Sequence, residues 1–392
     1  MKSIEDLSDL NQKKILLRLD LNVPLKDGKI TDATRIDKVL PTIKYLLKNN
    51  AKILILSHVG RPKGNIVSEL SLKPICNFIK QKINIDINLI TKNLKKINSE
   101  DLFINKDEKI IMFENIRFHK EEEENNNDFA KHISNLGDIF VNDAFSCSHR
   151  NHSSICQIPK FIPSYSGLQL NSELYALKKL TSNIQKPITC IIGGSKISTK
   201  INIIKNLIPK FDNIIIVGGM GNNILKYKGF EIGKSIIEKN CSELVEEIFN
   251  LSKKKNCKIF FPEDVLVGKN INDSSKIKLL KDVSFNEMIL DIGPNTIKTI
   301  KNTINASKTV LWNGPAGYFE NSNFSKGSYE IGKEIAKKTK EQKIYSVVGG
   351  GDTIKVINQI NLFNNYNFVS TAGGAFLEYL EGKNLPGIKA LN

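Results

Sequence analysis

The chain has 392 residues, of which 40% are hydrophobic, and a formal net charge of +16. This length favours two domains, because a single hydrophobic core stops growing at about 250–300 residues. No apolar run reaches the length of about 18 residues that crosses a bilayer, and the first ten residues are acidic rather than a basic leader. We therefore expect a cytoplasmic protein without a membrane partner.

The positive charge leaves two interpretations open. Nucleic-acid binding is one, but the lysines are scattered in ones, twos and one triplet, Lys253 to Lys255. A nucleic-acid groove would show a long basic block or interleaved aromatic residues. The scattered lysines favour a compositional bias of the surface. The electrostatic field of such a positive surface would also attract anionic substrates.

The six cysteines form no CxxC pair and no disulfide framework, which is typical of reduced thiols. A zinc site is an alternative for Cys147, His149, His152 and Cys156. Their spacing matches no closed structural-zinc pattern, and Arg150 among them would repel a dication.

Short runs of Ile, Val and Leu alternate with stretches of helical period along the whole chain. This alternation predicts βαβ units on parallel sheets. The expected strands are residues 14–20, 51–58, 109–115, 138–145, 188–194, 213–219, 258–264, 309–315 and 343–350. Ligands of such sheets bind beyond the carboxyl ends of the strands, so the residues that follow each strand are candidates for a site.

These strand endings differ between the two halves of the chain. Before residue 150 they are rich in arginine and histidine: Arg18 and Asn22, His58 and Arg61, Arg117 and His119, His149 and Arg150. After residue 190 they are rich in glycine. The halves are therefore expected to bind different ligands, with a helical linker at residues 166–182 between them.

The acidic run EEEENNND, residues 121–128, is interpreted as solvated surface rather than as a metal site. Arg35 stands in the first turn of a helix that we expect to begin near Thr31 or Asp32. A cation is disfavoured there by the helix dipole, which suggests a compensating anionic ligand. A local pair with Asp32 is the alternative.

The segment ITCIIGGSKISTK, residues 188–200, is a strand that ends in glycines and then presents Lys196 and Lys200. Glycines let the backbone approach a phosphate, and lysines four apart share one face if a helix follows them. An ordinary strand exit with solvated lysines is the alternative.

The segment KIYSVVGGGDTIKVINQI predicts a strand, a glycine turn and a helix. Its backbone amides suit phosphate, and Asp352 would then need a mediating cation such as Mg²⁺. Asp352 as a simple helix N-cap is the other interpretation.

The chain has neither a Walker loop nor a GxGxxG fingerprint, and it shows no Ser/His/acid arrangement. What remains is positioning by cations, which is what phosphoryl transfer requires. Lys196 and Arg35 are the candidates to neutralise the transferred group. An inactive basic binding protein and a dinucleotide-dependent dehydrogenase are the alternatives.

A series of motifs then suggests a family. LRLDLNVPL, SHVGRPKG, FENIRFHKEEE, SCSHRNHSS, GGSKISTK, WNGPAGYFE, VVGGGDT and STAGGAFLEYLEGK occur in this order over essentially the whole chain. The chain resembles phosphoglycerate kinase. The resemblance implies reversible transfer of the acyl phosphate of 1,3-bisphosphoglycerate to ADP, giving 3-phosphoglycerate and ATP with Mg²⁺, by a monomer.

The resemblance also implies the fold, which is α/β with two Rossmann-like three-layer α/β/α domains and mainly parallel sheets, joined by a hinge helix. The phosphoglycerate-binding domain is then residues 1–165 with a C-terminal return at about 378–392. The interdomain helix is residues 166–182, and the nucleotide-binding domain is residues 183–377. Closure about the hinge would bring the two ligands into line.

The site residues follow by motif. The catalytic pair is Arg35 and Lys196. The phosphoglycerate pocket is Asp20, Leu21, Asn22, Arg35, His58, Val59, Gly60, Arg61, Arg117 and Arg150. The nucleotide site is Gly194, Lys200, Gly218, Gly219, Asn313, Pro315, Glu320, Gly349, Gly350, Gly351, Asp352, Thr353, Gly373 and Gly374, with Asp352 as the Mg²⁺ ligand.

Two positions depart from the family pattern. Ala372 stands where the family commonly has glycine, which would cost about 1 kcal/mol if the position needs a positive φ. Ser146 and Cys147 replace the usual glycine, alanine or threonine.

Overall fold

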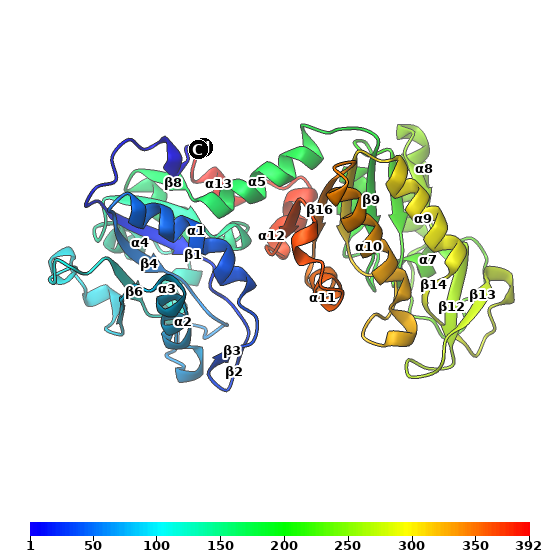
Figure 1. Cartoon of the computed structure of the whole chain (residues 1–392), viewed down its shortest axis with the longest axis horizontal. Helices are drawn as coiled ribbons and strands as arrows, with labels where there is room; N and C mark the ends of the chain where they lie inside the picture. The colour runs from blue at the N-terminus through cyan, green and yellow to red at the C-terminus, as the bar shows by residue number, and fades with distance from the viewer. The chain divides into compact units, whose positions relative to one another are not determined.

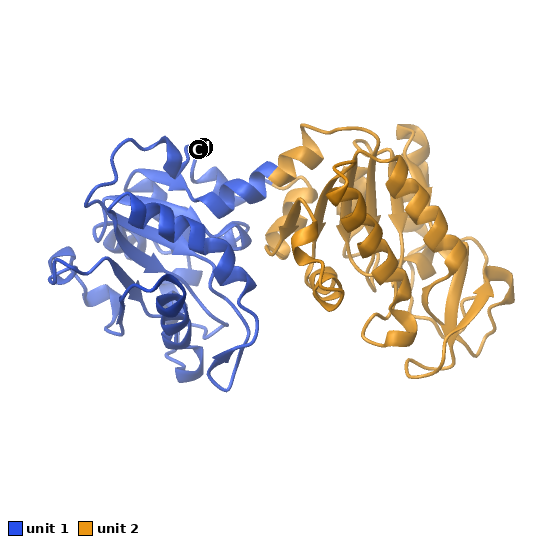
Figure 2. Ribbon diagram, viewed as in Figure 1, with its two compact units in different colours: residues 1–175, 384–392 blue, residues 176–383 orange.

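The computed structural model describes residues 1–392, which divide into two compact units (Figure 2). The first unit comprises Met1–Tyr175 and Asn384–Asn392, and the second comprises Ala176–Lys383. Helix α5 (Leu168–Thr181) runs across the boundary, inside the segment 166–182 that we expected to join the domains. No helix is both long and apolar enough to cross a membrane.

The first unit is built on a six-stranded sheet whose strands all run parallel. Their order in space is β5 (Ile87–Ile90), β6 (Ile110–Phe113), β4 (Lys52–Leu56), β1 (Lys14–Leu19), β7 (Ile139–Asp143) and β8 (Ser164–Ser166). β1, β4, β6 and β7 are buried along almost their whole length, which matches their continuous apolar sequences.

Helices flank this sheet (Figure 1). They are α1 (Thr34–Lys48), α2 (Lys73–Ile83), α3 (Lys120–Glu123), α4 (Asn127–Ser134) and the C-terminal α13 (Pro386–Lys389). α1 places Ile36, Val39 and Ile43 in the core against the sheet residues. A short hairpin, β2 (Leu25–Lys26) with β3 (Lys29–Ile30), precedes α1.

The second unit contains another all-parallel sheet of six strands. Their order is β11 (Lys258–Phe260), β10 (Asn213–Ile216), β9 (Ile188–Ile192), β15 (Thr309–Asn313), β16 (Tyr345–Gly349) and β17 (Phe368–Ser370). Its helices are α6 (Ile201–Leu207), α7 (Gly219–Tyr227), α8 (Ser242–Lys255), α9 (Pro294–Ala306), α10 (Lys326–Lys340), α11 (Gly351–Gln359) and α12 (Gly374–Leu380).

A small antiparallel sheet also belongs to the second unit. Its order is β13 (Lys276–Leu279), β12 (Asp264–Gly268) and β14 (Met288–Ile292). We expected residues 258–264 to be one strand, but β11 ends at Phe260 and β12 begins at Asp264 in the other sheet. Pro262 lies between them and has no amide hydrogen for a ladder.

The predicted fold class of two mainly parallel α/β sheets is confirmed. Two boundaries lie a few residues from the predicted positions. α1 begins at Thr34, because Asp32 accepts the Thr34 backbone N–H at 2.8 Å and so ends the preceding turn. The C-terminal return to the first unit begins at Asn384 rather than near 378, because α12 packs on α6 and Leu380 accepts a hydrogen bond from Asn206.

Candidate active site

In the first unit, the predicted pocket residues follow the carboxyl ends of neighbouring strands. Asp20, Leu21 and Asn22 follow β1, and His58 to Arg61 follow β4. Arg117 lies just beyond β6, in the 3₁₀ turn η5 (Ile116–Phe118). Arg150 lies beyond β7. Because these four strands are parallel and adjacent, their ends meet at one edge of the sheet.

The loops that carry these residues are tied together by hydrogen bonds. The side chain of Asn22 accepts the Gly60 backbone N–H at 2.9 Å, and Arg117 donates to the Gly60 carbonyl at 2.8 Å. The Leu21 backbone donates to Ser57 at 3.0 Å. Val59 is buried, whereas Arg61 is exposed and Arg150 is partly exposed.

Arg35 has a carboxylate partner within the protein. Its Nη1 lies 3.0 Å from Oδ2 of Asp20 and donates to the Asn22 carbonyl at 2.9 Å. Asp32, the alternative partner, accepts hydrogen bonds from the backbone N–H and the hydroxyl of Thr34. Asp20 also accepts a short hydrogen bond from Ser146, so this departure from the family pattern adds a direct contact in the pocket.

His58 is buried and has a cation beside it. Arg18 Nη2 lies 3.3 Å from its Nδ1. Burial, followed by the charges of Arg18 and Arg117, holds the pKa of His58 well below its ordinary value. The ring is therefore neutral at physiological pH.

The acidic run 121–128 is mostly exposed or partly exposed, as predicted, but Glu122 is an exception. Glu122 is fully buried and accepts hydrogen bonds from the Ser154 backbone at 2.8 Å and its hydroxyl at 2.6 Å. Glu123 lies 3.6 Å from Nε of Arg117. A run of like charges looks solvated in sequence, but here Glu122 and Glu123 lie beside Arg18 and Arg117 and offset their charges.

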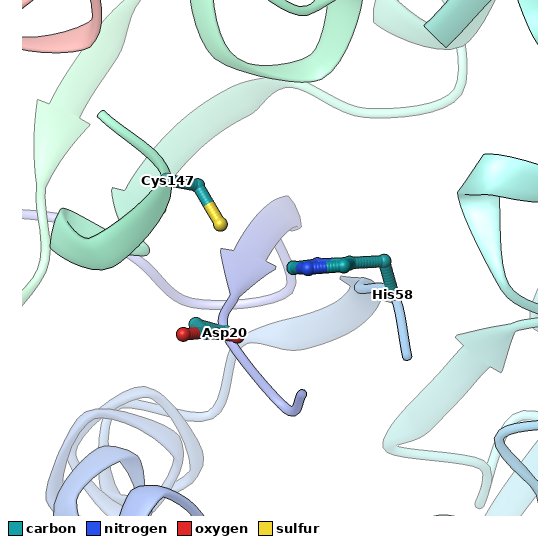
Figure 3. Close-up of side chains that lie close together, drawn as sticks. All are labelled: Asp20, His58 and Cys147. Carbon is teal, nitrogen blue, oxygen red and sulfur yellow. The ribbon is translucent and has the colours of Figure 1, made fainter. Parts of the chain in front are cut away.

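The potential metal ligands that the structure brings together are not the four residues weighed for a zinc site. Asp20, His58 and Cys147 place one ligand atom each within 4.8 Å of one another (Figure 3). Cys156 instead contacts the Arg150 carbonyl, and His152 lies beside Glu122. The Asp20 carboxylate is already bound by Arg35 and Ser146, and Arg18 adjoins His58, so this edge favours an anion rather than a dication.

In the second unit, Lys200 is held at the end of β9. Its Nζ donates to the Gly193 carbonyl and to Oδ1 of Asn313, each at 2.6 Å. Burial lowers the pKa of Lys200 to about 8, against an opposing effect of Asp352. Lys196 is exposed, and α6 begins only at Ile201, so the two lysines do not share a helix face as we had considered.

A helix, α11, begins at the glycine turn after β16, as the sequence predicts. Gly350 is the N-cap residue of α11, with a φ of +97°, so the N-cap interpretation of Asp352 was wrong. Asp352 lies in the first turn, is exposed and pairs with Lys355 at 2.9 Å. Thr353 accepts the Gly314 backbone N–H at 2.7 Å and so ties this turn to the end of β15.

Two pockets open along this edge of the second sheet. The smaller, of about 280 Å³, is lined by Lys196, Lys200, Asn313 and residues 350–353, among others. The larger, of about 380 Å³, includes Gly218, Gly219 and Glu320. Both pockets are lined by Gly194, Pro315 and Asp352, so the two pockets adjoin each other.

Sequence reasoning missed the apolar wall of the larger pocket, formed by Ile236, Ile271, Met288 and Leu290. These residues come from segments far apart in the sequence, so no local motif marks them as one wall. Only the structure brings them together.

Three predicted glycines do not line either pocket. Gly349 is buried at the end of β16, where a Cβ would meet the Phe376 ring at 2.6 Å. Gly373 and Gly374 begin α12. The positive φ of +54° belongs to Gly373, and Ala372 is not among the residues with positive φ, so alanine at 372 causes no left-handed strain.

Comparison with known proteins gives the family of the chain. The family model described as phosphoglycerate kinase matches residues 4–383. The chain belongs to this family. A phosphoglycerate kinase of Wolbachia pipientis wMel is 44% identical over 391 residues, 99% of this chain and 98% of its own length. One from Orientia tsutsugamushi strain Ikeda is 43% identical, over 100% of this chain and 98% of its own.

Solved structures of the family extend the likeness to the fold. The phosphoglycerate kinase of Coxiella burnetii gives a TM-score of 0.91 at 40% identity, covering 99% of this chain and 98% of its own. That of Pyrococcus horikoshii OT3 gives 0.83 at 27% identity, covering 100% and 98%. The family resemblance therefore spans both units.

The ends of β9 and β15 approach so closely that only glycine fits. A Cβ on Gly193 would lie 2.1 Å from the Pro315 carbonyl oxygen, whereas one on Gly351 would meet nothing within 4 Å. We predict that Gly193→Ala lowers the free energy of unfolding by about 1–3 kcal/mol, because backbone must shift. Gly351→Ala is the matched control and should unfold like the wild type in urea. Equal stability of the two variants would contradict this packing.

Proposed function

We propose that the chain catalyses reversible transfer of the acyl phosphate of 1,3-bisphosphoglycerate to ADP, giving 3-phosphoglycerate and ATP. The observation that carries the proposal is that each unit has its own type of binding residues at the carboxyl ends of its strands. They are arginines in the first unit, and glycines with lysines in the second. Guanidinium groups bind carboxylate and phosphate in a two-pronged way, which suits a small ligand bearing both groups.

The phosphoglycerate pocket would be formed by Asp20, Asn22, Arg35, His58, Arg61, Arg117 and Arg150, with Leu21, Val59 and Gly60 shaping its backbone. Arg35 is the cation proposed to act on the transferred group, and its link to Asp20 holds it at the edge. The His58 ring is neutral and so adds hydrogen bonding rather than charge.

The nucleotide would occupy the edge lined by the two pockets of the second unit. The larger pocket offers an apolar wall and Tyr318 for the base, with Glu320 at its border for ribose hydroxyls. The smaller offers Lys200 and the start of α11 for phosphates. Lys196 is exposed there and is the mobile cation proposed to accompany the phosphoryl group.

Magnesium is proposed as the companion of the nucleotide. The donor set fits, because Asp352 is an exposed carboxylate that lines both pockets, and Mg²⁺ in such sites is held by one or two carboxylates and phosphate oxygens. The ion would neutralise phosphate charge. Asp352 would hold it after giving up its pair with Lys355.

Transfer in line requires the two ligands to meet, and desolvation strengthens the cationic contacts when they do. We propose that the segment 166–182, which contains α5, provides the hinge for this movement. We further propose a cytoplasmic monomer that binds no nucleic acid, with its lysines as ordinary surface charge. Sedimentation as a dimer, or retention on random oligonucleotides at physiological salt, would contradict these points.

The direct test is ATP formation from 1,3-bisphosphoglycerate and ADP. We expect Lys196→Ala and Arg35→Ala each to lower kcat by about 10²–10³-fold, because each removes a charge from the transferred group. Lys254→Ala, which removes an exposed lysine of α8, is the control and should keep wild-type kcat. Near-wild-type kcat in either test variant would refute that residue's role.

Lys200 predicts a pH dependence of nucleotide binding. Its pKa of about 8 means that the ammonium form, which binds phosphate, is lost as the pH rises through 8. The KM for ATP should therefore be flat below about pH 7 and rise above pH 8 by up to about tenfold per pH unit. Lys200→Arg stays charged and should lack this rise. If the KM for ATP rose equally in the wild type and in Lys200→Arg, the titrating group would not be Lys200.

A further inference from the structure

Arginine is rare and localised in this chain. There are five arginines among 57 basic residues, and all of them, Arg18, Arg35, Arg61, Arg117 and Arg150, lie in the first unit. Four belong to the pocket proposed above. The fifth, Arg18, is the last residue but one of β1 and is fully buried.

Arg18 is held by a chain of hydrogen bonds that leads away from the pocket. Its Nε donates to the Ser154 hydroxyl at 2.7 Å, and this hydroxyl donates to the buried carboxylate of Glu122 at 2.6 Å. Nη1 donates to the Leu19 carbonyl. Glu122 lies 3.9 Å from Nη2 and supplies the opposite charge that a buried guanidinium needs.

The guanidinium group of Arg18 also contacts His58. Nη2 of Arg18 lies 3.3 Å from Nδ1 of His58. An arginine is always protonated and can only donate, so Nδ1 must be the acceptor and carry no hydrogen. The neutral ring then has its one proton on Nε2.

This proton position decides what the ring offers to a ligand. In the Nε2–H form, Nε2 of His58 is a hydrogen-bond donor and can bind an anionic oxygen. In the Nδ1–H form, Nε2 carries a lone pair, which repels the same oxygen. Figure 3 shows the ring beside Asp20 and Cys147, and Asp20 is one of the residues of the proposed pocket.

We propose that Arg18 is a positioning residue that fixes the Nε2–H form of His58, with Ser154 and Glu122 holding Arg18 in place. The proposal rests on the function proposed for the pocket and adds residues that do not themselves contact substrate. A lysine at position 18 has one donor group and cannot reach Ser154 and His58 with a planar fork.

The test begins with the ligand-free wild-type protein labelled with ¹⁵N-histidine. Long-range ¹H–¹⁵N spectra at pH 7, with His58→Gln to assign the signal, should show an unprotonated Nδ1 and a protonated Nε2. A proton on Nδ1, or a doubly protonated ring, would overturn the proposal. The spectrum is recorded without substrate and does not depend on enzyme activity. The proton position on His58 is therefore tested independently of the proposed reaction.

The second arm compares Arg18→Lys and Arg18→Met with the wild type. Both should raise the KM for 3-phosphoglycerate at least tenfold, leave the KM for ATP within twofold, and move the His58 signals toward a mixture of the two neutral forms. Lys52→Met is the matched control, because Lys52 is another buried cation of this sheet and donates to the Lys106 carbonyl at 2.7 Å. It should leave the His58 signals and both KM values unchanged.

A folded Arg18 variant that keeps the wild-type His58 spectrum and the wild-type KM for 3-phosphoglycerate would overturn the proposal. If neither variant folds, a wild-type spectrum with a proton on Nδ1 would still overturn it.

Discussion

The mutual repulsion of the arginines is the constraint that shapes the first unit. Arg117, Arg18 and Arg150 lie close enough that their charges, after burial, lower the pKa of His152 to about 3. Such a group of cations needs carboxylates nearby, and it has Asp20 beside Arg35, Glu122 beside Arg18 and Glu123 beside Arg117. Each of these three arginines therefore has a carboxylate beside it that offsets part of its charge.

The second unit has different residues at the ends of its strands. It contains no arginine, and its edge is made of glycine backbone, the start of α11 and lysines. The glycines let β9 and β15 end almost in contact, which brings Asn313 and Lys200 together. A flexible lysine suits a phosphate that changes place, whereas a rigid guanidinium suits a ligand that must be held in one orientation.

Much of this could be predicted from the sequence, because buried parallel strands are continuous apolar runs and their ends carry the polar residues. The β1, β4, β9 and β15 endings were found in this way. Glu122 was missed because a run of four glutamates looks solvated, and only tertiary packing buries one of them beside Arg18. Ile236 and Ile271 were missed because their contribution is apolar area brought from distant segments.

The first residues of the helices were also hard to predict from the sequence. α1 begins after a hydrogen bond from the Thr34 backbone to Asp32, and α11 begins after Gly350, which has a positive φ. The periodic spacing of hydrophobic residues reveals neither feature. The buried state of Lys200, which lowers its pKa, likewise follows from carbonyls that only the folded sheet places around it.

The central claim is that guanidinium geometry, and not positive charge alone, recognises the phosphoglycerate. Calorimetric titration of the triple variant Arg35→Lys, Arg117→Lys, Arg150→Lys tests this, because the variant keeps the net charge of +16. The account predicts that the Kd for 3-phosphoglycerate rises at least tenfold while the Kd for ATP stays unchanged. Wild-type affinity for 3-phosphoglycerate, or an equal loss for both ligands, would contradict it.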